Sequence, residues 1–170
     1  MTQRVSTIGD LLNTAIVAER NAELLYDRIS QMFIRYPEVA LFWEHYANEE
    51  AGHARWMEHL RGRMSAPQLA EPALAPIMEK ATIQANLDVE NLLAGINDLQ
   101  DAWELANELE HGETNLVFEF LIDNFSNDEN TMVFLRAQLR EHMDHLTSKV
   151  PAQFGDVTLR RSITANRPVS

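Results

Sequence analysis

A carboxylate and an imidazole stand three residues apart in the stretch Asn48-Glu49-Glu50-Ala51-Gly52-His53, inside a segment with strong helical periodicity. On a helix, this spacing places Glu50 and His53 on one face, within reach of one ion. The same face carries apolar side chains on both sides of the pair, so both polar groups should point inward. Burying an unpaired charge is costly, and a bound metal ion is the natural way to offset that cost.

Three further segments repeat this arrangement, each with ionisable residues in or beside an apolar stripe. A single Glu-x-x-His arises easily by chance, and we do not assign the second match, Glu108 with His111, to the site. If several ionisable groups are buried at mid-height of four helices, the free-energy cost of burying them without a metal ion would be prohibitive. Carboxylates and imidazoles without thiolates suit iron or manganese, and zinc less specifically. Bridging carboxylates can hold two ions close together. The predicted metal ligands are Glu19, Glu50, His53, Glu110, Glu113, His142 and His145.

Four long helices should position these residues, over about 6–35, 38–64, 97–125 and 128–150. Ser6 or Thr7 with Asp10 should cap the first helix, and the stretch 126–128 should cap the fourth. Three prolines in 65–76 argue against a regular helix there. They open a long connection to about 97, with helical turns expected near 77–84 and 90–94. We therefore predict an all-α four-helix bundle of two hairpins joined by a long crossover. Residues 1–150 would form this domain, and 151–170 a flexible or partner-packed extension.

An internal repeat supports two equivalent hairpins. A shift of 92 residues places Glu50 on His142 and His53 on His145, and it also superposes aromatic positions. Each hairpin would bring one ligand-bearing face to a shared midline.

Composition narrows the classes of function. The 170 residues carry a net charge of −12, which argues against nucleic acid or an anionic membrane as a partner. The absence of cysteine excludes disulfides, thiolate metal sites and cysteine nucleophiles. The first residues lack the apolar segment of a secretory signal, and no apolar run approaches a membrane span. We expect a cytoplasmic protein.

At its predicted ligands, the sequence resembles the ferritin-like di-iron carboxylate family, and within it the rubrerythrin branch. Glu19 with Tyr26 looks like the first-helix motif, and the stretch 48–53 like the second. Glu110-His111-Gly112-Glu113 resembles the third-helix Glu-x-x-Glu, and Glu141-His142-Met143-Asp144-His145 occupies the fourth-helix position. The resemblance covers about residues 6–150 and implies two iron ions per chain, with manganese or zinc as alternatives.

The resemblance also implies roles for these residues. Glu50 would bridge the ions, Glu19 and Glu110 would be terminal or second bridging ligands, and His53 and His145 would each bind one ion. His142 would be an additional ligand. The catalytic residues would be Glu113, as a mobile carboxylate, and Tyr26, because either could pass protons.

Two features depart from the family pattern. The fourth helix should provide Glu-x-x-His, but His142 occupies the place of the Glu. Glu141 is one residue earlier, about 100° around the helix, and cannot substitute without distortion. The site could therefore be asymmetric, hold one metal, or prefer a different metal. Secondly, a chain without cysteine cannot carry the rubredoxin-like domain that often delivers electrons in this family.

The function implied is reduction of hydrogen peroxide, or less readily of dioxygen, by an oxidoreductase with a di-metal centre. A separate electron-donor protein would then be required, and by analogy we expect a homodimer. Two alternatives stay open: iron storage or delivery with ferroxidase activity, and a degenerate structural dimer with a one-metal or empty site. Whether the chain is an enzyme is therefore undecided from sequence.

Overall fold

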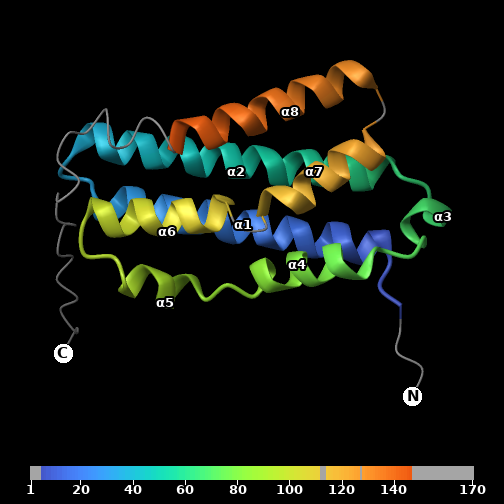
Figure 1. Ribbon diagram of the computed structural model, residues 1–170, viewed down its shortest axis with the longest axis horizontal. Helices are drawn as coiled ribbons and strands as arrows, with labels where there is room; N and C mark the ends of the chain where they lie inside the picture. Colours follow the sequence, from blue (N-terminus) through green and yellow to red (C-terminus); the bar gives the residue numbers. More distant parts are fainter. Residues whose placement is uncertain (1–4, 112–113, 127, 147–170) are drawn as a thin grey trace.

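The computed structural model describes residues 5–111, 114–126 and 128–146, and these ranges are almost entirely helical (Figure 1). They form no β-strand; an isolated antiparallel bridge joins Thr7 and Pro72. The predicted all-α class is confirmed. The helices are α1 (Ile8–Met32), α2 (Pro37–Arg63), α3 (Ala66–Leu69), α4 (Ala75–Ala85), α5 (Val89–Ala94), α6 (Leu99–His111), α7 (Thr114–Phe125) and α8 (Glu129–Asp144).

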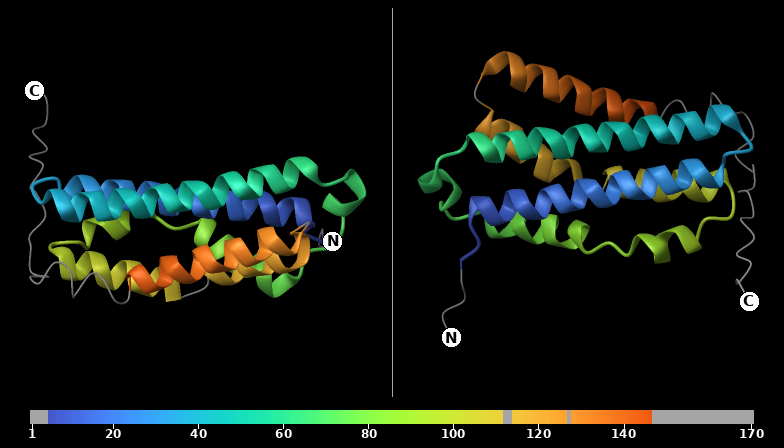
Figure 2. Two further views of the ribbon diagram at one scale, coloured as in Figure 1. Left: turned by 90° about the horizontal axis from the view of Figure 1, so that it is seen from above. Right: turned by 180° about the vertical axis from the view of Figure 1, so that it is seen from behind.

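The helices form two layers (Figures 1 and 2). One layer is the antiparallel hairpin of α1 and α2, which make the most extensive contact in the molecule. In the other layer, α6 and α7 run in the direction of α2, and α8 returns along them. Two hairpins therefore face each other, and each layer can present one apolar face to the other.

Local sequence signals fix where the main helices begin. Thr7 and Asp10 form a capping box: the Thr7 amide donates to Asp10 Oδ2 at 3.0 Å, and the Asp10 amide to Thr7 Oγ1 at 3.2 Å. Pro37 opens α2, where its missing N–H is no loss. Asp128 caps α8 by accepting from the Thr131 amide at 2.7 Å. The predicted caps of the first and fourth helices are thus present.

The connection from α2 to α6 runs the length of the bundle beside α1 (Figure 2). Its helical turns α4 and α5 match the two that were expected. The prediction that 65–76 holds no regular helix was wrong for one short segment, α3. Pro67 lies in the first turn of α3, where a proline costs no hydrogen bond, and Ser65 caps it.

Two predicted boundaries differ from the structure. The single helix expected over 97–125 is assigned as α6 and α7, on either side of residues 112–113, which lie outside the described ranges. The fourth helix ends at Asp144, with His145 at its C-cap, rather than near 150. The expected 151–170 extension, and with it the domain boundary at 150, lies outside the described residues and remains a prediction.

The apolar core consists of two clusters stacked along the bundle. One is rich in aromatic side chains and contains Tyr26, Trp43 and Tyr46. The other contains Met57 and Phe118. In four of the helices a buried ionisable residue falls between the two clusters: Glu19 in α1, Glu50 and His53 in α2, Glu110 in α6 and His142 in α8. These groups therefore form a polar layer with apolar packing on both sides.

In the described part of the chain, no helix is both long enough and apolar enough to cross a membrane.

Candidate metal centre

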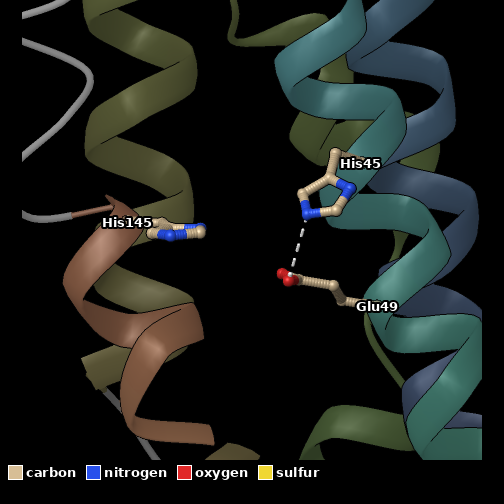
Figure 3. A group of neighbouring side chains, drawn as sticks. All are labelled: His45, Glu49 and His145. Atoms are coloured by element: carbon tan, nitrogen blue, oxygen red, sulfur yellow. Dashed lines mark ion pairs between the residues drawn. The ribbon is translucent and has the colours of Figure 1, made fainter. Parts of the chain in front are cut away.

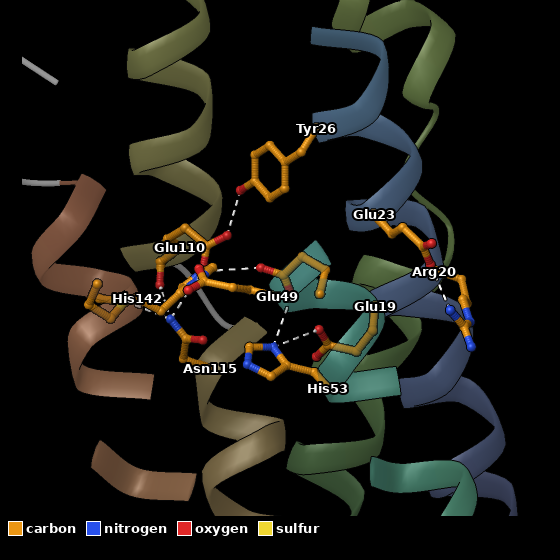
Figure 4. Close-up of polar contacts among 11 residues, drawn as sticks. Glu19, Arg20, Glu23, Tyr26, Glu49, His53, Glu110, Asn115 and His142 are labelled. Atoms are coloured by element: carbon orange, nitrogen blue, oxygen red, sulfur yellow. Dashed lines mark hydrogen bonds and ion pairs between the residues drawn. The ribbon is translucent and has the colours of Figure 1, made fainter. Parts of the chain in front are cut away.

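The polar layer consists of three carboxylates and two imidazoles, all at most 8% exposed (Figure 4). Helix periodicity explains their convergence, because each residue occupies an inward position of its helix. The members are Glu19, Glu50, His53, Glu110 and His142. They divide into two groups of three that could each hold a metal ion.

The first group joins α1 and α2. His53 Nδ1 lies 3.0 Å from Glu50 Oε2 and 3.4 Å from Glu19 Oε2. One ligand atom from each of these three residues lies within 4.8 Å of the other two. The pair on α2 is the Glu-x-x-His motif, and the Glu19 carboxylate approaches it from the neighbouring helix.

The second group joins α2, α6 and α8. His142 Nε2 lies 3.0 Å from Glu50 Oε1 and 3.1 Å from Glu110 Oε2. Glu50 therefore belongs to both groups: its Oε2 faces the first and its Oε1 faces the second. A carboxylate placed in this way can bridge two ions, as in two-metal sites.

A comparison with protein-family models identifies the family of the chain. The family model described as Rubrerythrin matches residues 10–131. The chain belongs to the rubrerythrin family. Its all-α bundle is accordingly ferritin-like, and the family is one of di-iron carboxylate proteins. A search of curated proteins and a search of solved structures each found no match.

The matched range contains three of the four ligand-bearing helices of the rubrerythrin-like centre. It ends at residue 131, so His142 and His145 lie beyond it. The departure at His142 therefore falls in the part of the chain that the family model does not cover. The position of His142 in the bundle therefore comes from the structure and not from the family match.

The donor atoms fit a metal centre. Glu19 Oε2, Glu50 Oε1 and His142 Nε2 are buried, and no hydrogen-bond partner for them is found within the described residues. Glu19 Oε2 lies 3.4 Å from His53 Nδ1, and Glu50 Oε1 lies 3.0 Å from His142 Nε2. Buried polar atoms normally have hydrogen-bond partners, so atoms without them call for a ligand. Oxygen and imidazole donors without sulfur suit iron, manganese or zinc.

Burial and mutual charge perturb the protonation of the centre in the metal-free chain. Burial, reinforced by the Glu50 carboxylate, raises the pKa of Glu19 to about 8. Burial disfavours the charged form of His53, but the Glu50 and Glu19 carboxylates outweigh it and raise the pKa of His53 to about 10. At neutral pH both groups therefore carry a proton.

Attraction between imidazolium and carboxylate groups also shifts the pKa values in the second group. Burial disfavours the imidazolium of His142, but the carboxylates of Glu110 and Glu50 raise its pKa well above the usual value. Conversely, His142 and His53 overcome the burial of Glu50 and lower its pKa well below the usual range. Protons on the imidazoles thus occupy the place that metal charge would take.

Hydrogen bonds from surrounding residues orient the ligands. The Tyr26 hydroxyl donates to Glu110 Oε1 at 2.5 Å, and the Tyr46 hydroxyl donates to the His142 backbone oxygen at 2.5 Å. Glu49 Oε2 lies 2.7 Å from His142 Nδ1, which leaves Nε2 directed at Glu50 and Glu110. Such outer partners fix the ring orientation of a metal-binding histidine.

Aromatic rings cover both imidazoles. The ring centroid of Phe118 lies 4.4 Å from that of His53, and the centroid of Tyr46 lies 4.2 Å from that of His142. Both imidazoles thus pack against aromatic rings of the neighbouring core clusters.

Two of the predicted ligands, Glu113 and His145, are not among the residues that the structure places in the polar layer. Glu113 lies outside the described residues, so its placement stays a prediction. His145 joins neither buried group; it lies with His45 and Glu49 between α2 and the end of α8 (Figure 3). The internal repeat had paired His145 with His53, but His142 is the residue that completes the buried ligands. His142 continues the inward stripe of Leu135 and Leu139, whereas His145 falls on its flank.

Sequence reasoning missed two residues of the site, Glu49 and Tyr46. The adjacency of Glu49 to Glu50 was a weak signal, because neighbouring residues on a helix point about 100° apart. Only the packing of α8 against that flank of α2 brings His142 to Glu49.

An open cavity of about 510 Å³ leads to the centre between α2 and α8. His53 and His142 lie at its inner wall, and Glu49, Trp56 and Phe134 are among its other lining residues. A small molecule can therefore reach the imidazole side of the polar layer.

Proposed function

We propose that this protein reduces hydrogen peroxide at a pair of non-haem iron ions in the polar layer. The observation that carries the proposal is the position of Glu50, whose two carboxylate oxygens face two separate ligand groups. Membership of the rubrerythrin family supports the same function. Glu19 and His53 would hold one ion, Glu110 and His142 the other, and Glu50 both.

Reduction of one peroxide to two waters takes two electrons and two protons, and two bound ferrous ions can supply one electron each. The ligand set suits this starting state. His142 replaces a carboxylate with a neutral donor once its proton has left, so the centre holds one carboxylate fewer than the family pattern. Less negative charge around the ions favours the ferrous state over the ferric state.

The protons can come from the residues of the chain. Burial, together with the Glu110 and Glu50 carboxylates, raises the pKa of Tyr26 well above its usual value, so its hydroxyl stays protonated. That hydroxyl donates to Glu110 Oε1 at 2.5 Å, and Tyr26 thereby holds a proton next to a proposed ligand. Glu113 remains a proposed second proton carrier.

The cavity between α2 and α8 supports access of a small oxidant. It reaches His53 and His142, while the two apolar clusters pack on either side of the polar layer along the bundle. Peroxide could thus enter without exposing the whole ligand set to water. A separate protein would deliver the electrons, and a homodimer is proposed on family resemblance.

The test is anaerobic reconstitution with two ferrous ions per chain, followed by stoichiometric hydrogen peroxide. We expect one peroxide to be consumed for every two ferrous ions oxidised, faster than the same protein reacts with dioxygen. Glu50→Gln should lose this reaction, whereas Glu44→Gln, an exposed carboxylate on the same helix, should keep it. Iron uptake far above two ions per chain, or oxidation that depends on dioxygen alone, would contradict the proposal and favour iron storage.

A further inference from the structure

A third cluster of potential ligands lies outside the polar layer, between α2 and the end of α8 (Figure 3). Its members are His45 and Glu49, one turn apart on α2, and His145 at the C-cap of α8. One ligand atom from each residue lies within 4.8 Å of the other two. The proposed peroxide chemistry makes no use of His45 or His145.

Glu49 connects this cluster to the buried centre. Its Oε2 lies 2.7 Å from His142 Nδ1, and its Oε1 lies 3.4 Å from His45 Nε2. One oxygen of the carboxylate is therefore engaged with the buried histidine, while the other faces outward. Glu49 could bind an outer ion through Oε1 without giving up its contact with His142.

We propose that His45, Glu49 and His145 form a third metal site, which binds a divalent first-row transition ion. Two imidazoles and one carboxylate are the protein ligands of several zinc sites that keep a position open for water. In a tetrahedral site the donor atoms would lie about 3.4 Å apart, given metal–ligand distances near 2.1 Å. Donors already within 4.8 Å need only small rotations of side chains to reach that spacing.

The surroundings of the cluster favour capture of an ion from solvent. The His45 side chain is 63% exposed, and His45 and Glu49 both line the cavity that reaches His142 and His53. Glu141 Oε1 lies 3.5 Å from His145 Nε2 and offers a fourth donor. Two of the three ligands thus line the same cavity as the buried histidines, so an ion held there would lie on a route to the buried ligands.

The alternative is that these residues form an ordinary surface ion pair and bind no metal. An exposed pair such as His45 with Glu49, four residues apart on a helix, contributes little to stability. It would not explain why His145 approaches both residues from another helix. A metal site accounts for the convergence of all three side chains.

The experiment counts zinc ions in metal-free protein by titration against a chromophoric chelator. We expect three ions per chain in the parent and two in His45→Ala and in His145→Ala. His59→Ala removes an exposed histidine from the same helix outside the cluster, and should keep three. Circular dichroism and the urea midpoint should be unchanged in His45→Ala, because that side chain is mostly exposed.

This experiment tests the third site whether or not the buried centre binds metal. If the buried centre bound no metal, the parent would hold one ion and His45→Ala none, and the difference of one would persist. Equal zinc counts in the parent and in His45→Ala would overturn the third site. A loss of one ion in His59→Ala as large as that in His45→Ala would overturn it as well.

Discussion

Loading metal into the empty centre should release about three protons per chain at pH 7. At that pH the metal-free centre holds protons on His53, whose pKa is raised to about 10, and on His142, whose pKa lies well above its usual value. Glu19, with a pKa of about 8, is about nine-tenths protonated. Metal ligands must be deprotonated to bind, so all three protons have to leave.

The same pKa values make the number of protons released on metal binding depend on pH. At pH 9, Glu19 has already lost about nine-tenths of its proton, while His53 still holds most of its own. Proton release should therefore be smaller at pH 9 than at pH 7 by about one proton per chain, because Glu19 no longer has one to give. Glu19→Gln removes the titrating carboxyl group, so the proton release of this variant should not show this fall.

The assay is anaerobic calorimetry with two equivalents of manganese, in pairs of buffers that differ in protonation enthalpy. Manganese avoids both redox chemistry and the easy deprotonation of zinc-bound water. The His45→Ala background keeps the proposed outer site from contributing. Release of fewer than about one proton at pH 7 would refute the charge balance described for the centre. Equal release by the parent centre at pH 7 and pH 9 would refute the role of Glu19.

Two further predictions concern the protein itself. Tyr26→Phe removes the 2.5 Å hydrogen bond to Glu110 inside the core, so we expect about 1–3 kcal/mol less stability and slower peroxide turnover; unchanged unfolding and turnover would contradict this. The stability of the metal-free protein should fall as the pH rises from 6 to 10. The folded-state pKa values of His53 and Glu19 are raised to about 10 and about 8, so the stabilisation that their protons provide is lost as the pH passes through those values. Urea unfolding followed by circular dichroism measures this trend, and a midpoint that stays constant or rises toward pH 10 would argue against it.

Helical periodicity was sufficient to predict most of the centre from sequence. Glu19, Glu50, His53 and Glu110 each interrupt an apolar stripe, and a residue on such a stripe is buried whatever the details of the packing. The capping box of Thr7 and Asp10 likewise depends only on neighbouring residues. These features are local, which explains why the sequence reveals them.

The roles of the two histidines on α8 were less well predicted. The apolar stripe of Leu135, Leu139 and Leu146 indicated that His142 faces inward and His145 lies on the flank, whereas the resemblance and the internal repeat gave His145 the role of a ligand equivalent to His53. The structure agrees with the stripe, because the packing of α8 buries His142 and leaves His145 beside His45. The contact of Glu49 with His142 follows from that packing and has no signal of its own in the sequence.

The most direct test of the di-metal centre is the iron content of protein reconstituted anaerobically in the His45→Ala background, measured by mass spectrometry. We expect about two iron ions per chain, because Glu50 serves two ligand groups at once. Adding Glu50→Gln should reduce the content to less than one ion, whereas adding Glu44→Gln on the same helix should leave it at two. One ion or none before Glu50 is changed, or two ions after Glu50→Gln, would contradict a shared bridging carboxylate.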